Sequence, residues 1–111
     1  MMPVFFENSE KIKKANNNIQ IEKEDYAILR KILTKYQYTF YVYGSRSRGS
    51  ATRYSDIDVF CKEKIKPEDL VDIVTQLEES NITIKVDLTD AVSCTQEFIN
   101  IIQEDLIELM I

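Results

Sequence analysis

Apolar and polar residues alternate in two short segments of the chain, a period of two that is typical of β-strands with one buried face. This alternation predicts strands over residues 56–62 and 81–88, and aromatic and β-branched residues predict another over 38–43. In the first segment the odd-numbered residues form the apolar face, so Asp56 and Asp58 point together to the opposite face. The pattern therefore places two carboxylates side by side where a strand begins.

Apolar residues at helical spacing flank these strands. One helix is predicted over residues 22–36. A second is predicted to begin at Pro67, because proline favours the first helical turn. Its buried face is expected to carry Leu70, Ile73, Val74 and Leu77. Helices and strands thus alternate along the chain.

The C-terminal segment is predicted to form one long helix. Ser93 and Gln96 match a capping box, and the helix is expected to run to about Met110. Its apolar residues cover more than one face: Phe98, Ile99, Ile101, Ile102, Leu106, Ile107, Leu109 and Met110. A helix that is apolar on two sides is buried either in its own domain or against another chain, and the sequence leaves both open.

The order of the elements predicts a small α/β (α+β) domain, with a mixed β-sheet and flanking helices. With 111 residues the chain has room for one domain and one modest core. We assign residues 21–111 to this domain and residues 1–20 to an N-terminal extension, because residues 9–18 are polar and end in three asparagines. That polar stretch is expected to be a loop, with a short helix after Ser9 as the alternative.

The composition excludes several kinds of chemistry. The chain has no histidine, which removes Ser-His triads, histidine acid–base catalysis and most transition-metal sites. Its two cysteines match no zinc motif, and Cys61 is expected to be a buried side chain in a reducing compartment. No apolar run approaches the roughly 18 residues of a membrane span, and the N-terminal apolar segment is too short for a signal peptide. We therefore expect a cytoplasmic protein without a membrane-spanning helix.

Charge is distributed unevenly along the chain. The net charge is −5, from 19 acidic and 14 basic residues, which argues against a long nucleic acid as the direct substrate. Between residues 44 and 66, however, there are six basic residues and three acidic ones. A locally basic site on an acidic protein suits a small polyphosphate better than a polymer.

The start of that basic segment combines a phosphate-binding turn with metal-binding carboxylates. Gly44 has no side chain, so a triphosphate can approach its backbone, and Ser45 adds a hydroxyl group. Residues 45–48 are expected to start a helix whose free N–H groups bind phosphate. Asp56 and Asp58 lie roughly 6.5 Å apart along their strand, which lets both carboxylates hold a pair of Mg²⁺ ions. Together these features indicate nucleotidyl transfer.

A third carboxylate is expected for the ion that activates the attacking hydroxyl group. Asp87 lies on the polar face of the strand predicted over residues 81–88, where a neighbouring strand would place it beside Asp58. Asp90 is the alternative, but it follows that strand and suits the start of the last helix better. The predicted catalytic and metal-binding residues are Asp56, Asp58 and Asp87.

The spacing of these residues resembles a known signature. Gly44 and Ser45, ten further residues and then Asp56-Ile57-Asp58 match the G-S-x10-D-x-D pattern of the DNA polymerase β nucleotidyltransferase superfamily. The residues around both motifs resemble its minimal nucleotidyltransferase (MNT) branch. The likeness extends from about Glu22 to Met110, and it implies a polymerase β-like fold.

The resemblance also implies roles for individual residues. Two Mg²⁺ ions would be held by three carboxylates: Asp56, Asp58 and Asp87. The nucleotide substrate would be ATP or another nucleoside triphosphate, in contact with Gly44, Ser45, Arg46 and Arg48. Arg46 matches the basic position that often follows the Gly-Ser pair, and Arg46 or Arg48 would offset the charge of the leaving pyrophosphate.

MNT proteins are typically paired with a separate all-helical HEPN subunit. In several pairs the HEPN chain is a ribonuclease toxin, and the MNT chain silences it by transferring AMP onto a tyrosine. The resemblance thus implies an adenylyltransferase that acts as an antitoxin, with the predicted last helix as a contact for the partner.

Two alternatives stay open. The chain could be the catalytic subunit of a two-component enzyme that modifies a small molecule, or a non-catalytic module that binds a nucleotide or inhibits by contact. The sequence also leaves open the nucleotide preference, the number of nucleotides added and the homo- or hetero-oligomeric state.

Overall fold

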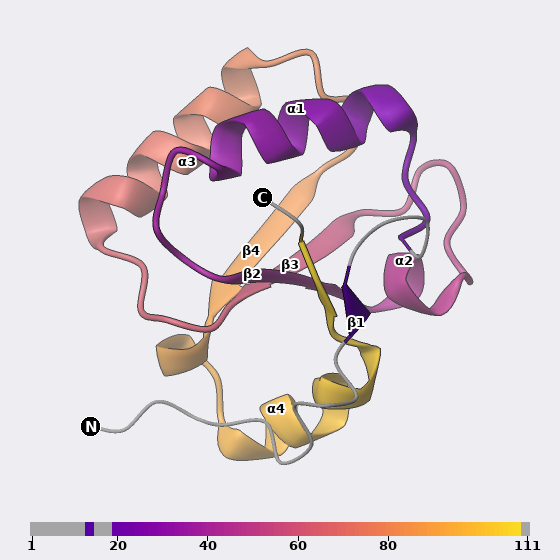
Figure 1. The fold of residues 1–111 in the computed structure, drawn as a ribbon, viewed down its shortest axis with the longest axis vertical. Coiled ribbons are helices and arrows are strands. Elements are labelled where there is room, and N and C mark those ends of the chain that lie inside the picture. The colour runs from indigo at the N-terminus through magenta and orange to yellow at the C-terminus, as the bar shows by residue number, and fades with distance from the viewer. Residues whose placement is uncertain (1–12, 15–18, 110–111) are drawn as a thin grey trace.

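A twisted β-sheet lies at the centre of the molecule, with helices on both of its faces (Figure 1). The structure, a computed structural model, describes residues 13–14 and 19–109. Within these residues the sheet has five strands in the order β1-β5-β2-β3-β4. The strands are β1 (Lys13–Lys14), β2 (Phe40–Tyr43), β3 (Ile57–Cys61), β4 (Val86–Asp90) and β5 (Ile107–Glu108). The predicted mixed α/β fold with flanking helices is confirmed.

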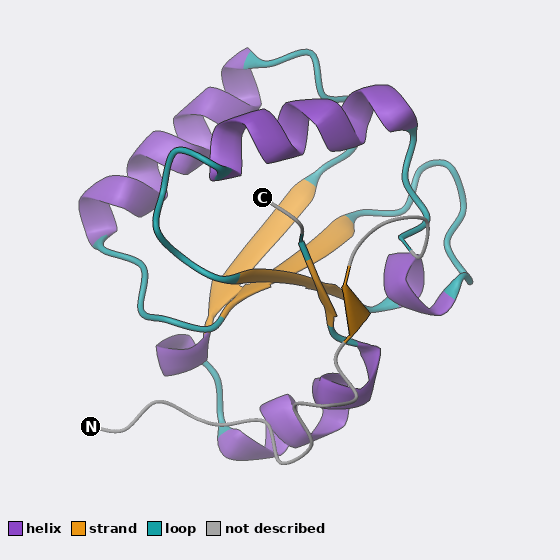
Figure 2. Cartoon of the chain, in the orientation of Figure 1, coloured by secondary structure: helices purple, strands orange, loops and turns teal. Residues whose placement is uncertain are grey.

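The longer helices form two layers. α1 and α3 cover one face of the sheet and α4 covers the other, while α2 lies beside the end of β2 (Figure 2). The α-helices are α1 (Lys23–Leu33), α2 (Ser45–Arg48), α3 (Pro67–Glu79) and α4 (Gln96–Ile102). Two short 3₁₀ turns, Ala91–Ser93 and Gln103–Asp105, flank α4.

Strand β3 packs against both layers of helices. It pairs antiparallel with β2 and parallel with β4. As predicted, its alternate residues face different layers: Ile57 and Val59 are buried with side chains of α1 and α3, whereas Phe60 is buried with side chains of α4. Because Asp58 shares a face with Phe60, its carboxylate lies on the α4 side of the sheet.

Local sequence explains where the helices begin. Pro67 occupies the first turn of α3, as predicted. The capping box predicted at Ser93 is wrong, because the hydroxyl of Thr95 accepts the hydrogen bond from the Phe98 N–H at 3.1 Å and caps α4. Ser93 instead ends the preceding 3₁₀ turn.

The prediction of one long C-terminal helix is also wrong, because α4 ends at Ile102. The chain makes a 3₁₀ turn there and returns as β5, which pairs antiparallel with β2 and parallel with β1. Ile107 and Leu109 are buried on insertion of this segment beside β2. The apolar pattern on two sides thus reflects a change from helix to strand, so it is no longer an argument for a docked partner. Met110 lies outside the described residues.

The strand predicted over residues 81–88 lies further along the chain, at Val86–Asp90. Ile82 and Ile84 still pack against the core but precede the strand. The physical reason lies in Thr83, whose backbone N–H donates to the carboxylate of Asp25 at 2.8 Å instead of to a neighbouring strand.

One further prediction is wrong in part, and another is confirmed. On α3, Ile73 and Leu77 are buried, but Leu70 and Val74 remain 38% and 41% exposed. Cys61 is buried as predicted, and burial raises the pKa of its thiol to about 12.

The N-terminal extension takes part in the sheet through β1, which pairs with β5. The helix considered after Ser9 falls outside the described residues. The division of the chain at residue 20 stays a prediction.

The burial of α4 makes a first prediction. Ile99 is fully buried and Ile101 is 75% exposed on the same helix. We expect Ile99→Ala to lower the free energy of unfolding by about 2–5 kcal/mol and Ile101→Ala to change it by less than about 0.5 kcal/mol. Urea unfolding followed by circular dichroism measures both values. Equal losses in the two variants would contradict the described packing of α4.

Candidate functional site

The turn that follows β2 lies against the carboxylate of Asp58. Gly44 caps α2 with a φ of 78° and a ψ of −153°, a conformation that is essentially restricted to glycine. In the β2–β3 ladder, its neighbour Tyr43 is paired with Asp58. A Cβ atom on Gly44 would lie 2.5 Å from Oδ2 of Asp58, so any side chain there would displace the carboxylate. Glycine is therefore required at this position for both its conformation and its size.

Helix α2 begins beside that carboxylate. The N–H groups of Ser47 and Arg48 both donate to the carbonyl of Gly44 at 3.0 Å. The first N–H groups of a helix have no acceptor within the helix, and in α2 these are the N–H groups of Ser45 and Arg46. Gly49, with a φ of 79°, ends the helix after one turn. The predicted short helix after Gly44 is thus present, and its first turn can bind an anion.

Three acidic residues lie at the same edge of the sheet. Asp58 and Asp87 are paired in the parallel ladder between β3 and β4, so they are neighbours on the same face. Asp56 lies immediately before β3. Asp58 is half-buried, whereas Asp56 and Asp87 are exposed. The structure brings together the three acidic residues that the sequence selected.

The ionisation of Asp58 reflects this crowding. Burial raises the pKa of the Asp58 carboxyl above its ordinary value, and the negative charges of Asp87 and Asp56 raise it further. Arg48 acts in the opposite direction. A half-buried carboxylate that is repelled by two others gains stability from any cation that binds among them.

The donor set fits Mg²⁺, which prefers carboxylate and phosphate oxygens to nitrogen or sulfur. Among the described residues, no three acidic or cysteine side chains converge closely enough to hold an ion by themselves. Mg²⁺ in nucleotide sites is commonly bound by one or two carboxylates together with phosphate oxygens. Asp56, Asp58 and Asp87 therefore fit an ion that arrives with a triphosphate, rather than one held permanently by the protein.

Aromatic side chains support the site from the α4 layer, a feature that no sequence motif indicates. The rings of Tyr43 and Phe98 meet edge to face, with 5.9 Å between their centroids. Burial raises the pKa of the Tyr43 hydroxyl, and the charge of Asp58 contributes to the increase. Tyr43 thus remains neutral and forms an uncharged wall beside the carboxylates.

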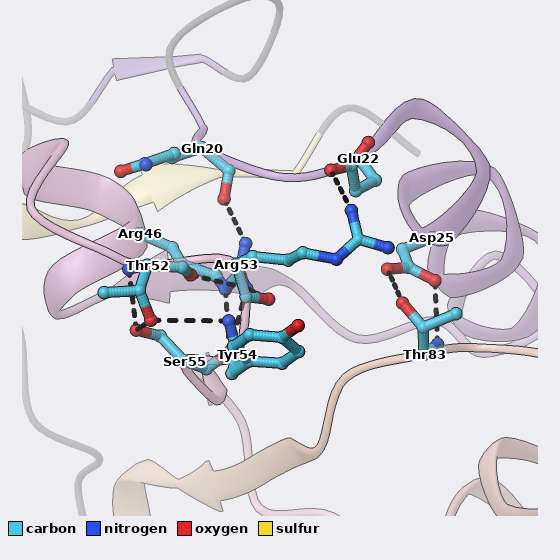
Figure 3. Close-up of polar contacts among 9 residues, drawn as sticks. All are labelled: Gln20, Glu22, Asp25, Arg46, Thr52, Arg53, Tyr54, Ser55 and Thr83. Carbon is cyan, nitrogen blue, oxygen red and sulfur yellow. Dashed lines mark hydrogen bonds and ion pairs between the residues drawn. The ribbon is translucent and has the colours of Figure 1, made fainter.

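Arg46 does not occupy the position expected of a phosphate ligand. Its side chain is buried, and its guanidinium group donates to the carbonyls of Gln20, Thr52, Arg53 and Ser55 (Figure 3). These bonds occupy the donors that a phosphate would need. The expectation that Arg46 offsets pyrophosphate charge is therefore not supported by its geometry.

Arg48 is better placed for that task. Its side chain is 54% exposed, and its guanidinium group forms an ion pair of 2.7 Å with Asp105. It is also close enough to Asp58 to lower that residue's pKa. Of the two arginines in the motif, only Arg48 has a guanidinium group that can turn towards a bound phosphate.

Asp90, the alternative third carboxylate, has a structural role. It is the last residue of β4, and its carboxylate accepts hydrogen bonds at 2.9 Å from the backbone N–H groups of Ser93 and Ile65. Burial alone would raise the pKa of this carboxyl, but the hydrogen bonds and Lys64 lower it below its ordinary value. Asp87 is therefore the carboxylate beside Asp58.

A cavity elsewhere on the molecule does not belong to this site. An apolar groove of about 380 Å³ lies between α3 and residues 80–86, on the face of the sheet opposite Asp58. None of the three carboxylates lines it.

In the part of the chain that the structure covers, no helix has the length and apolar character to cross a membrane.

Comparison with known proteins finds one matching family and a similar curated protein. Residues 28–110 match the family model described as "Polymerase beta, Nucleotidyltransferase". The curated protein named "Probable protein adenylyltransferase MntA", from Haemophilus influenzae, is 31% identical over 94 residues, which span 78% of this chain and 79% of the relative. The segment that matches the family model contains the turn at Gly44 and all three carboxylates.

The contact between Gly44 and Asp58 makes a prediction about cation binding. We expect Gly44→Ala to lower the free energy of unfolding by about 1–3 kcal/mol. In the presence of a non-hydrolysable ATP analogue, we also expect it to abolish binding of Mn²⁺, a paramagnetic substitute for Mg²⁺. Gly49→Ala is the control, because Gly49 also has a positive φ but no described atom within 4 Å of the place that a Cβ would take. Its expected loss is about 1–2 kcal/mol, with Mn²⁺ binding retained. Similar Mn²⁺ affinities in both variants, measured by electron paramagnetic resonance, would contradict the close approach.

The raised pKa of Asp58 makes a prediction about stability and pH. Since the folded protein binds this proton more tightly than the unfolded chain, stability falls as pH rises through the window above the ordinary pKa of 3.8. We expect Asp58→Asn to raise the melting temperature at pH 7 in EDTA, and this gain to vanish towards pH 4. Asp90→Asn, at a carboxyl with a lowered pKa, is expected to lower the melting temperature at pH 7. A lower melting temperature for Asp58→Asn at pH 7 would argue against crowded carboxylates.

Proposed function

The chain belongs to the polymerase β nucleotidyltransferase family, and we propose that it transfers a nucleoside monophosphate, AMP from ATP, to a hydroxyl group of a protein. The observation that carries this proposal is the pairing of Asp58 with Asp87 beside the turn at Gly44. That arrangement combines anion-binding N–H groups with three carboxylates at one edge of the sheet. Both parts are needed to hold a triphosphate while its α-phosphorus is attacked.

The proposed roles follow from the position of each group. Ser45 and the first N–H groups of α2 bind the β- and γ-phosphates. Asp87 accepts the hydrogen bond of the acceptor hydroxyl and takes its proton as the oxygen attacks the α-phosphorus. The bond between the α-phosphorus and the bridging oxygen breaks, and pyrophosphate leaves with its charge offset by Arg48. Two Mg²⁺ ions bound with the triphosphate at Asp56, Asp58 and Asp87 would neutralise phosphate charge and favour deprotonation of the hydroxyl.

Catalysis is favoured over a purely inhibitory module by the crowding of the carboxylates. Asp58 is half-buried and repelled by two neighbouring charges, which destabilises the folded chain in the absence of a cation. A module that acts only by contact gains nothing from this arrangement. Destabilising groups of this kind are typical of sites at which charge must be bound during a reaction.

The exposure of the site favours a large acceptor. Asp56 and Asp87 are exposed, and neither lines the apolar groove beside α3. Small acceptors are usually enclosed in a pocket, whereas a hydroxyl on a protein surface can approach an exposed Asp87 directly. The name of the Haemophilus influenzae relative, a probable protein adenylyltransferase, agrees with a protein acceptor.

We propose further that this acceptor is a tyrosine of an all-helical HEPN partner and that the chain acts as its antitoxin in the cytoplasm. The similarity to the MNT branch supports the partner and the antitoxin role. The two cysteines, which are free thiols in the structure, support the cytoplasm, because thiols are kept reduced there. A charged adduct on the partner's catalytic surface would block the binding of its RNA substrate.

The experiment is the intact mass of the helical partner after incubation with this chain, ATP and Mg²⁺. We expect a gain of one AMP or more, and we expect Asp58→Asn to slow the reaction by at least about 100-fold, because it removes one charged group from the site of phosphate transfer. Glu97→Gln, an exposed carboxylate on α4, is the control and is expected to retain full activity.

An unchanged partner mass with every common nucleoside triphosphate, while the two chains still bind each other, would refute protein modification. Equal rates for wild type and Asp58→Asn would refute the proposed roles of the carboxylates.

A further inference from the structure

Two buried charged side chains lie outside the proposed chemistry. Within the described residues, Arg46 is 4% exposed and Asp25 is 2% exposed, and these two are the buried charged residues. Burying a charge is unfavourable unless hydrogen bonds compensate it. Both residues direct their hydrogen bonds to loops that lead into catalytic strands, and Figure 3 shows the two sets of contacts next to each other.

Arg46 holds the loop before Asp56. Its guanidinium group donates to the carbonyl of Ser55 at 2.9 and 3.1 Å, and to those of Thr52 and Arg53 at 3.3 and 3.1 Å. These three carbonyls lie within residues 52–55, so the loop curves around the planar guanidinium group of Arg46. Since Ser55 directly precedes Asp56, the position of the Ser55 backbone determines where the Asp56 side chain lies.

The same guanidinium group is tied to the segment before α1. It donates to the carbonyl of Gln20 at 2.6 Å, and the Gln20 N–H donates to the carbonyl of Arg46 at 2.8 Å. The Gln20 side chain also exchanges two hydrogen bonds with the backbone of Ala51, at 2.8 and 3.0 Å. The loop that leads to Asp56 is therefore fixed at both ends to one short segment.

Asp25 holds the other loop from the first turn of α1. Its carboxylate accepts hydrogen bonds from the backbone N–H of Thr83 at 2.8 Å and from the Thr83 hydroxyl at 2.6 Å. Thr83 lies four residues before Asp87. Between them, the carbonyl of Lys85 accepts from the N–H of Ile57 at 2.9 Å, which joins the two loops where β3 and β4 begin.

We infer that Arg46 and Asp25 are positioning residues, which fix the loops before β3 and β4 and thereby set the separation of Asp56, Asp58 and Asp87. This inference rests on the proposed function of those carboxylates. Among the described residues, the charged groups of both form their hydrogen bonds with backbone atoms and the Thr83 hydroxyl, and not with the three carboxylates. They act through backbone that carries the site, as outer hydrogen-bond partners do in metal sites, where their loss typically weakens metal affinity or activity by about 10–100-fold.

The test compares variants that keep or remove these bonds. Asp25→Asn retains an oxygen acceptor for the Thr83 N–H, whereas Asp25→Leu removes it at similar volume. Arg46→Lys keeps the charge but cannot span the carbonyls of residues 52–55. Leu33→Ala lowers stability on α1, roughly 12 Å along the helix from Asp25, and is the control for general destabilisation.

Two quantities are measured on each folded variant below its melting temperature. The first is the affinity for Mn²⁺ in the presence of a non-hydrolysable ATP analogue, from electron paramagnetic resonance. The second is hydrogen exchange of the backbone at residues 52–58 and 83–88. Should Asp25→Leu fail to fold, Thr83→Val removes the hydroxyl bond alone and gives a milder version of the same change. Should Arg46→Lys fail to fold, Gln20→Ala removes the two side-chain bonds to Ala51 in the same loop.

We expect Asp25→Leu and Arg46→Lys to weaken Mn²⁺ binding by about 10–100-fold and to accelerate exchange in their own loops, with Asp25→Asn and Leu33→Ala close to wild type. Wild-type affinity in Asp25→Leu and Arg46→Lys, or an equal loss in Leu33→Ala, would overturn the inference. If wild type itself bound no Mn²⁺, the proposed function would fail, while unchanged exchange in the loops would still refute the positioning role.

Discussion

The approach of Gly44 to Asp58 is the constraint on which the rest of the site depends. A turn without a side chain lets the backbone of α2 lie against a carboxylate of the neighbouring strand, with no room for a Cβ between them. Backbone N–H groups that suit an anion and a carboxylate oxygen that suits a cation are thereby held side by side. A triphosphate with its metal ions carries both kinds of charge, so the ligand we propose is complementary to this geometry.

This arrangement is unfavourable for the isolated chain, and other contacts compensate for it. Asp58 is half-buried among like charges, and Arg48 offsets that repulsion only in part. The loops that bring Asp56 and Asp87 towards Asp58 are fixed by Arg46 and Asp25, whose own charges are fully hydrogen-bonded. A site that is electrostatically strained is therefore supported by a well-satisfied buried polar network.

Much of the site could be predicted from the sequence because it is encoded locally. The period of two along residues 56–62 determines the face of the sheet on which Asp58 lies, and the same period along residues 81–88 determines the face of Asp87. The strand that carries Asp87 nevertheless begins five residues later than predicted. The displacement arises from the bond between Asp25 and Thr83, which joins residues 58 positions apart. No local pattern indicates such a contact.

The same limit explains the remaining errors. Arg46 is of a residue type that often binds phosphate, but its guanidinium group is bonded to four backbone carbonyls. No sequence motif indicates that these carbonyls lie around it. The segment after Ile102 continues a helical apolar pattern, yet it pairs with β2 because that strand would otherwise lack a partner on one side. Asp90 differs from these two cases, because its position after the predicted strand already indicates the capping role that the structure shows.

The central claim is that the triphosphate and its metal ions bind between α2 and the carboxylates of β3 and β4. A crystal structure of this chain with Mn²⁺ and a non-hydrolysable ATP analogue tests it most directly, because anomalous scattering locates the manganese. We expect manganese at Asp58, shared with Asp56 and Asp87, and the β- and γ-phosphates at Ser45 and the first turn of α2. Manganese absent from these carboxylates, with the nucleotide bound elsewhere, for instance in the groove beside α3, would contradict it.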